Sequence, residues 1–100
     1  MNTVLYRQGD VLLVKTGDIK DKSVVASGRV VLADGEVTGH QHVVEGDVTE
    51  YLAMGRRLLE CGSTTVVIHQ EHAPITLPAG MYWIVAQREY SPQEIRRVAD

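Results

Sequence analysis

Short apolar runs separated by turn residues dominate this sequence and constrain its fold most. The runs recur every ~8–12 residues, with glycine, proline or acidic residues between them. No helical period occurs before residue 90, so we predict an all-β domain, a small barrel or sandwich of about seven or eight strands. The segments that read as strands are 11–14, 24–25, 29–32, 36–45, 48–52, 57–61, 64–69, 75–77 and 81–88.

Two turn signals indicate where neighbouring strands should separate. Asp34-Gly35 is a strong hairpin signal, because both positions accept a positive φ. Gly46-Asp47 divides the predicted strand 36–45 from the predicted strand 48–52. We therefore expect a two-residue hairpin at the first position and the end of a strand at the second.

The end of the chain has a different character. Ser91 can cap a helix, Pro92 suits its first position, and Glu94 can complete a capping box. Ile95 and Val98 are three residues apart, so one face of such a helix could dock on the barrel. We predict one short C-terminal helix over 91–100.

Length and charge limit the class of protein. One hundred residues make a single domain, which we expect to span 1–100. The net charge of −3 argues against a nucleic-acid-binding protein, which normally carries a basic stripe. No apolar run approaches the ~18 residues of a membrane span, and residues 1–7 lack the apolar core of a signal peptide. We expect a cytoplasmic protein that binds neither nucleic acid nor membrane.

The histidines are the residues most typical of a functional site. All four lie in two short pairs, His40 with His42 and His69 with His72. Neutral imidazole is the commonest metal ligand among side chains. Residues two apart in a strand face the same side, so His40 and His42 could reach one ion. The two pairs predict a metal site built from separate strands.

The second pair needs a bend, because residues three apart in a straight strand face opposite sides. Ala73-Pro74 follows at once, and the residue before a proline favours an extended or turn conformation. A bulge or bend at Gln70-Glu71 would bring His69 and His72 together. We then expect all four imidazoles to converge on one divalent transition metal. The residue types do not choose among zinc, iron, nickel and manganese.

Further side chains could complete the metal site. A carboxylate could supply another ligand or accept a hydrogen bond from a ring N–H, and the nearest are Glu36, Glu45 and Glu71. Cys61 is the only cysteine; it could be a ligand, but a lone cysteine is more often a small core residue. Three protein ligands plus water would make a catalytic type of sphere, and four nitrogen ligands a closed structural one.

Two resemblances follow from these motifs. The segment 35–45, with Gly39-His40-Gln41-His42, looks like the first motif of the cupins, small β-barrels that hold a metal with His-x-His, a later glutamate and a histidine from a second motif. Here Glu45 comes one or two residues early, and no histidine follows Pro78-Ala79-Gly80. Over most of its length the chain also resembles a family of short uncharacterised proteins from bacterial and phage genomes. The matching pieces are 7–12, 35–42, 69–75 and 87–90, and this resemblance implies no activity.

Three functions fit these observations. The first is a metal-binding module without catalysis, in which the ion ties separate segments together. The second is a cupin-like metalloenzyme with an open coordination position. The third is a metal-free interaction or pH-sensing domain, since clustered imidazoles titrate near neutral pH. An edge strand could also support a homo-oligomer. No arginine or lysine is tied by spacing to the histidines, so the sequence does not indicate a substrate class, and it leaves both a small-molecule ligand and enzymatic activity open.

Overall fold

The structure, a computed structural model, describes residues 4–34 and 39–86. These residues form eight β-strands, which confirms the all-β class and the predicted strand number. No helix among them is long and apolar enough to cross a membrane. The predicted helix over 91–100 lies outside the described residues. The strands are β1 (Leu5–Gln8), β2 (Val11–Thr16), β3 (Ser23–Asp34), β4 (Gln41–Ala53), β5 (Arg56–Cys61), β6 (Thr65–Ile68), β7 (Ile75–Leu77) and β8 (Gly80–Ala86).

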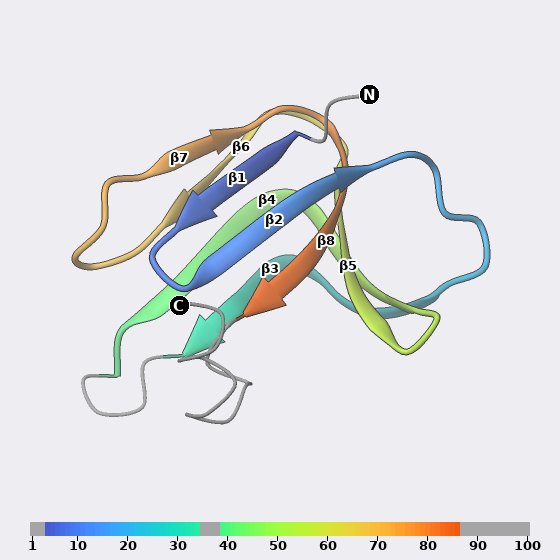
Figure 1. The fold of residues 1–100 in the computed structure, drawn as a ribbon, viewed down its shortest axis with the longest axis horizontal. Helices are drawn as coiled ribbons and strands as arrows, with labels where there is room; N and C mark the ends of the chain where they lie inside the picture. The colour runs from blue at the N-terminus through green and yellow to red at the C-terminus, as the bar shows by residue number, and fades with distance from the viewer. Residues whose placement is uncertain (1–3, 35–38, 87–100) are drawn as a thin grey trace, which may run out of the picture.

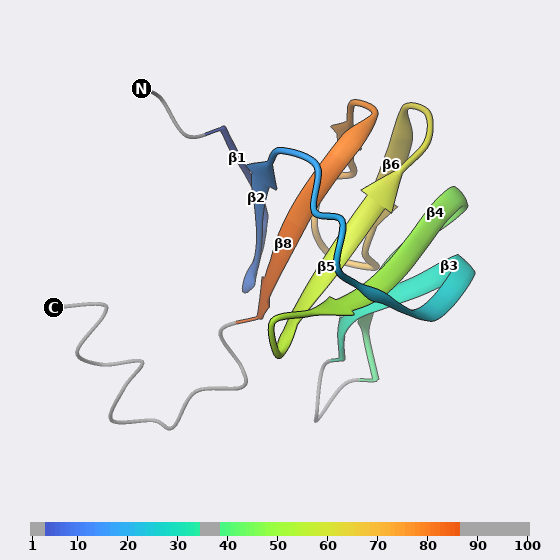
Figure 2. The same cartoon turned by 90° about the vertical axis from the view of Figure 1, so that its right-hand side faces the viewer.

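The strands form one antiparallel sheet that curls into a nearly closed barrel. Their order is β1-β2-β8-β5-β4-β6-β7, and β3 pairs with β4. The two ends of this path, β1 and β7, lie against each other (Figure 1), and we call the line between them the seam. Figure 2 shows β2, β8, β5, β4 and β3 following one another around the barrel.

The long strand β4 turns a corner of the barrel without ending. Gly46, with a φ of 116°, lies where we predicted that one strand ends before the next begins. Before Gly46, Val43 and Val44 pair with β6, and after it the residues from Val48 onward pair with β5. The predicted end of a strand at Gly46-Asp47 is therefore wrong, because β4 runs through it. Glycine supplies the bend that moves one strand from one neighbour to the next.

The predicted hairpin at Asp34-Gly35 has the right partners but a longer connection. Asp34 pairs with Gln41, so β3 and β4 are antiparallel neighbours joined by 35–40 rather than by two residues. The two-residue hairpin lies instead between β4 and β5. Its central residues, Met54 and Gly55, have φ values of 54° and 71°, as a type I′ turn requires.

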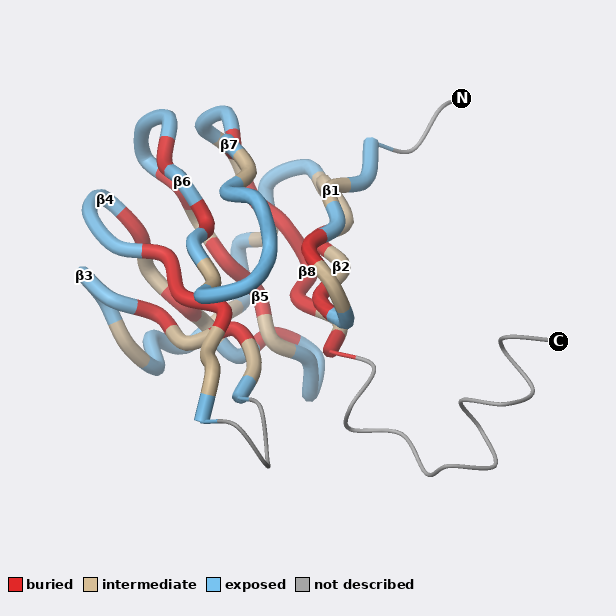
Figure 3. The backbone as a smooth tube through the Cα atoms, turned by 90° about the vertical axis from the view of Figure 1, so that its left-hand side faces the viewer, coloured by how far each residue is buried: buried red, intermediate tan, exposed pale blue. Residues whose placement is uncertain are grey.

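The interior of the barrel is filled mainly by aliphatic side chains and Tyr82. The buried segments of β2, β4, β5 and β8 face one another across it (Figure 3). Burial raises the pKa of Tyr82 to about 12, and its hydroxyl donates to the carbonyl oxygen of Pro78 at 2.6 Å. Cys61 is buried and free, as expected of a core residue, and burial raises the pKa of its thiol. Trp83 is buried in a second, smaller cluster with Leu58.

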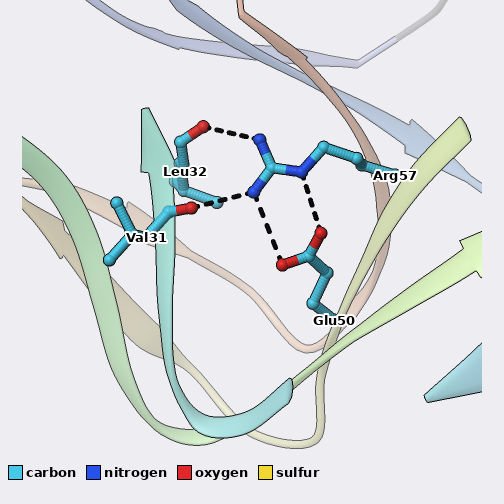
Figure 4. Close-up of polar contacts among 4 residues, drawn as sticks. All are labelled: Val31, Leu32, Glu50 and Arg57. Carbon is cyan, nitrogen blue, oxygen red and sulfur yellow. Dashed lines mark hydrogen bonds and ion pairs between the residues drawn. The ribbon is translucent and has the colours of Figure 1, made fainter. Parts of the chain in front are cut away.

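A partly buried ion pair joins Arg57 of β5 to Glu50 of β4, and the same guanidinium group also binds β3 (Figure 4). Arg57 donates through Nε to the Glu50 carboxylate at 2.8 Å, and its two terminal nitrogens donate to the carbonyl oxygens of Val31 and Leu32, each at 2.8 Å. The register between β3 and β4 shifts between Val31 and Ala33. Arg57 therefore satisfies the carbonyl groups at an irregularity of β3, next to the residue that pairs with His42.

Candidate metal centre

Three of the four histidines come together at one end of the barrel. His42 lies near the start of β4 and is buried, with 5% of its surface exposed. His69 and His72 lie in the loop 69–74 that joins β6 to β7, half-buried and exposed respectively. One ligand atom from each of the three lies within 4.8 Å of the others. The bend predicted at Gln70-Glu71 is present, since β6 ends at Ile68 and a bend occupies 70–72.

The three rings also pack against one another. The centroids of His42 and His69 are 4.2 Å apart, and those of His69 and His72 are 4.6 Å apart. His42 and His72 are nearly parallel, with centroids 5.6 Å apart. Such contacts suit neutral imidazoles, because three charged rings at these distances would repel one another.

His40 lies beside this group but outside it. Its ring is perpendicular to that of His69 at 5.6 Å, and its Nδ1 lies 3.6 Å from a carboxylate oxygen of Glu71. His40 precedes the first residue of β4, so the alternation that would place it on the same face as His42 does not apply there. The group therefore contains three of the four histidines that we expected.

None of the described carboxylates predicted to assist the site is a member of the histidine group. Glu45 forms an exposed ion pair with Arg29 at 3.2 Å, but it lines the same pocket as His69. The Glu71 carboxylate faces His40. Glu36 lies outside the described residues. Cys61 is not a member of the histidine group.

His42 is held by the buried side chain of Gln8, at the end of β1. The Gln8 amide oxygen lies 2.8 Å from Nδ1 of His42. The Gln8 amide nitrogen donates to the carbonyl oxygens of Val67 and Ala73, at 3.0 and 2.9 Å. This network orients the imidazole before any ion arrives.

His69 is held by a hydrogen bond from the backbone of its own loop. The backbone N–H of Glu71 donates to Nδ1 of His69 at 3.0 Å, so this nitrogen carries the lone pair in the neutral ring. Burial lowers the pKa of His69 from its ordinary 6.5, and the neighbouring His72 and His40 lower it further, while Glu71 acts in the opposite direction. The neutral form that binds metal is thus favoured at neutral pH.

His72 packs against a glycine in the turn between β1 and β2. Gly9 has a φ of 57°, and a β-carbon built on it would lie 2.6 Å from Nε2 of His72. Any larger residue at this position would displace the imidazole. Gly9 therefore provides the space in which His72 reaches the other two rings.

A shallow pocket of about 270 Å³ on the outer face of β4 and β6 adjoins His69. His69 and Gln70 form one side of it, and Arg29 contributes a cation. Val43 and Ile68 give it apolar surface. The pocket touches the histidine group only through His69.

All of the residues that form this centre fall within one conserved domain family. Residues 7–87 match the family described as Domain of unknown function (DUF8820). The chain belongs to this family. No curated protein and no solved structure matches this chain. Membership of DUF8820 agrees with the expected uncharacterised family, and the resemblance to cupins stays a prediction.

Sequence reasoning missed Gln8 and Gly9 as residues that contact the histidine group. Neither residue is a metal ligand type, and β1 was not among the predicted strands. The available signal was the segment 7–12, which carried part of the family resemblance without any assigned role. Its residues contact the two histidine-bearing segments only after the barrel has curled.

Proposed function

We propose that this protein binds one divalent transition-metal ion through His42, His69 and His72. The observation that carries the proposal is that ligand atoms of these three side chains, from two separate segments, lie within 4.8 Å of one another. Imidazole nitrogens that share a tetrahedral ion at ~2.0–2.1 Å are about 3.3 Å apart. The three side chains therefore need to close by ~1.5 Å at most.

The loop 69–74 can supply this movement, because it lies outside the ladders of the sheet. His69 would either bind through Nδ1, giving up the hydrogen bond from Glu71, or turn its ring. His42 needs no such change, since its Nδ1 is already paired with Gln8. A bound ion would therefore be held by one ligand that stays in position, His42, and by two that move with the loop, His69 and His72.

Elemental analysis of untagged protein tests the proposal. We expect about one equivalent of a transition metal after incubation with zinc and removal of excess ion. The His72→Ala variant should lose this metal while keeping its fold, because His72 is exposed. Unchanged metal content in His72→Ala, or no metal in the natural sequence, would contradict the proposal.

The His40→Ala variant is the matched control, because it removes a histidine next to the group but outside it. We expect it to retain the full equivalent. Loss of metal in His40→Ala as complete as that in His72→Ala would instead support the four-histidine site expected from the sequence.

One observation favours a second candidate, a metalloenzyme. Three histidines leave a fourth coordination position for water or a substrate, and a pocket adjoins His69. Cobalt substitution followed by titration with azide tests it. A change in the visible spectrum on adding azide indicates an open position, and an unchanged spectrum favours the non-catalytic metal-binding module.

Three further expectations rest on the sequence alone. They are the cytoplasmic location, the bacterial or phage origin and assembly into a homo-oligomer. Each stays a prediction.

A further inference from the structure

We infer that Gln8 is the positioning residue of the histidine centre: its side chain fixes which nitrogen of His42 can bind an ion and bridges both ends of the loop that carries the other two ligands. The part of this inference that concerns metal affinity rests on the proposed function. The part that concerns the ring of His42 stands on the hydrogen bonds alone.

The orientation of the Gln8 amide follows from its neighbours. Two carbonyl oxygens, those of Val67 and Ala73, lie 3.0 and 2.9 Å from its nitrogen. Carbonyl oxygens only accept hydrogen bonds, so the –NH₂ group must face them and the amide oxygen must face His42. Gln8 is 3% exposed, which leaves little room for water to change this arrangement.

The protonation of His42 follows in turn. An amide oxygen cannot donate, so Nδ1 of His42, at 2.8 Å, must carry the hydrogen. In the neutral ring the lone pair then lies on Nε2. A histidine ligand usually donates its other ring N–H to a carbonyl or carboxylate group, which fixes the tautomer and raises the basicity of the ligating nitrogen. Gln8 supplies that acceptor here.

The same side chain joins the two sides of the seam. Gln8 ends β1, Val67 lies in β6, and Ala73 lies in the loop that leads to β7. Val67 and Ala73 flank His69 and His72 in the chain, so one amide group bridges the two ends of the ligand-bearing segment. The position of the loop ligands and the tautomer of His42 therefore depend on a single residue.

NMR of the metal-free protein tests the tautomer directly. A long-range ¹H–¹⁵N correlation spectrum distinguishes the protonated ring nitrogen from the one that carries the lone pair. We expect His42 to be protonated on Nδ1 in the natural sequence. Protonation on Nε2 would overturn the inference, whatever metal the protein binds.

Substitution of Gln8 separates its two contacts. Gln8→Met removes both, and we expect metal affinity to fall by roughly 10–100-fold. Gln8→Glu keeps an acceptor for His42 but no donor for Val67 and Ala73. We expect it to retain the Nδ1–H form of His42, and loss of that form would count against the inference.

Val48→Ala is the control for stability. Val48 is buried in β4 beyond the corner at Gly46, and its truncation weakens the core without touching the histidines. We expect its metal affinity to stay within about threefold of the natural protein, since no ligand contact changes. Equal losses of metal affinity in Gln8→Met and Val48→Ala would show that Gln8 acts only through the stability of the fold.

Failure of the two proposals can be told apart. If no metal binds but His42 is protonated on Nδ1, the proposed function fails and the positioning by Gln8 stands. If metal binds with His42 protonated on Nε2 in the metal-free protein, the function stands and the role of Gln8 is wrong.

Discussion

The two halves of the histidine centre differ in how firmly the fold holds them. His42 is buried in β4, which pairs with β3 on one side and β6 on the other, and its ring is fixed by Gln8. His69 and His72 lie in the loop 69–74, which has no ladder partner among the described residues. If the proposed ion binds, His42 would already be in place, and His69 and His72 would complete the site around it.

This difference separates stability from binding. A ligand inside the sheet belongs to the core, so its removal affects both the free energy of unfolding and the metal affinity. A ligand on an exposed loop affects the metal affinity alone. The predictions below test this distinction, from the largest expected effect to the smallest.

The largest effect is expected from His42→Ala. It leaves a cavity beside β4 and removes the partner of the Gln8 amide oxygen, so the free energy of unfolding of the metal-free protein should fall by about 3–5 kcal/mol. His72→Ala should change it by less than ~0.5 kcal/mol, because His72 is exposed. Urea unfolding with a chelator present measures both. Equal destabilisation by the two variants would remove the distinction between the halves.

The fixed half also depends on Arg57, which pairs with Glu50 of β4 and donates hydrogen bonds to two carbonyl groups of β3. Arg57→Met leaves the buried carboxylate of Glu50 unpaired and two carbonyl groups of β3 without donors. We expect a loss of about 2–3 kcal/mol, since Arg57 is 29% exposed and the pair is not fully desolvated. The control is Arg29→Met, which breaks an ion pair between two exposed side chains and should cost less than ~1 kcal/mol. Similar midpoints for the two variants in urea would contradict this account.

Metal should order the loop more than the strand. At a free ion concentration of about ten times the Kd, binding stabilises the protein by about 1.4 kcal/mol. NMR order parameters of 70–72 should rise towards the ~0.85 of rigid backbone, while those of 42–44 should not change. A rise of equal size in both segments would show that β4 is no more fixed than the loop.

The smallest effect concerns pH. Burial, and after it His72 and His40, lower the pKa of His69 below 6.5, so the unfolded chain binds more protons than the folded one below that pH. Its contribution to stability is present above pH 6.5 and is lost as the pH falls from 6.5 through the lowered pKa. The metal-free protein should thus have a slightly lower Tm at about pH 5.5 than at about pH 8. His69→Gln should show a smaller difference in Tm between these two pH values. If its difference equals that of the natural protein, His69 is not the cause, and this result would also argue against the pH-sensing alternative.

Local patterns in the sequence predicted most of the strands and the meeting of the two histidine-bearing segments. The apolar runs at 57–61 and 75–77 became β5 and β7, and the bend at 70–72 lies where we expected one at Gln70-Glu71. The strands and the bend depend on a few adjacent residues, whereas the meeting of the two segments was inferred from the ligand chemistry of their histidines. Short-range chemistry is enough to specify the strands and the bend.

The errors arose where a residue's role depends on contacts distant in the sequence. Gly46-Asp47 has the composition of a turn, but β4 continues because it gains β5 as a new neighbour beyond the bend. A more local error is the start of β4, which was predicted at 36 and lies at Gln41, so that His40 precedes the strand. Gln8 is an ordinary polar residue until the barrel brings its amide beside His42, 34 positions away.

The seam has a kinetic consequence. No backbone ladder joins β1 to β7 in the described chain, and Gln8 bridges this line through its side chain. Three hydrogen bonds can break and re-form far faster than a sheet can dissolve. A bound ion would then leave and enter through brief separation of this edge, and its exchange rate would be independent of how slowly the whole barrel unfolds.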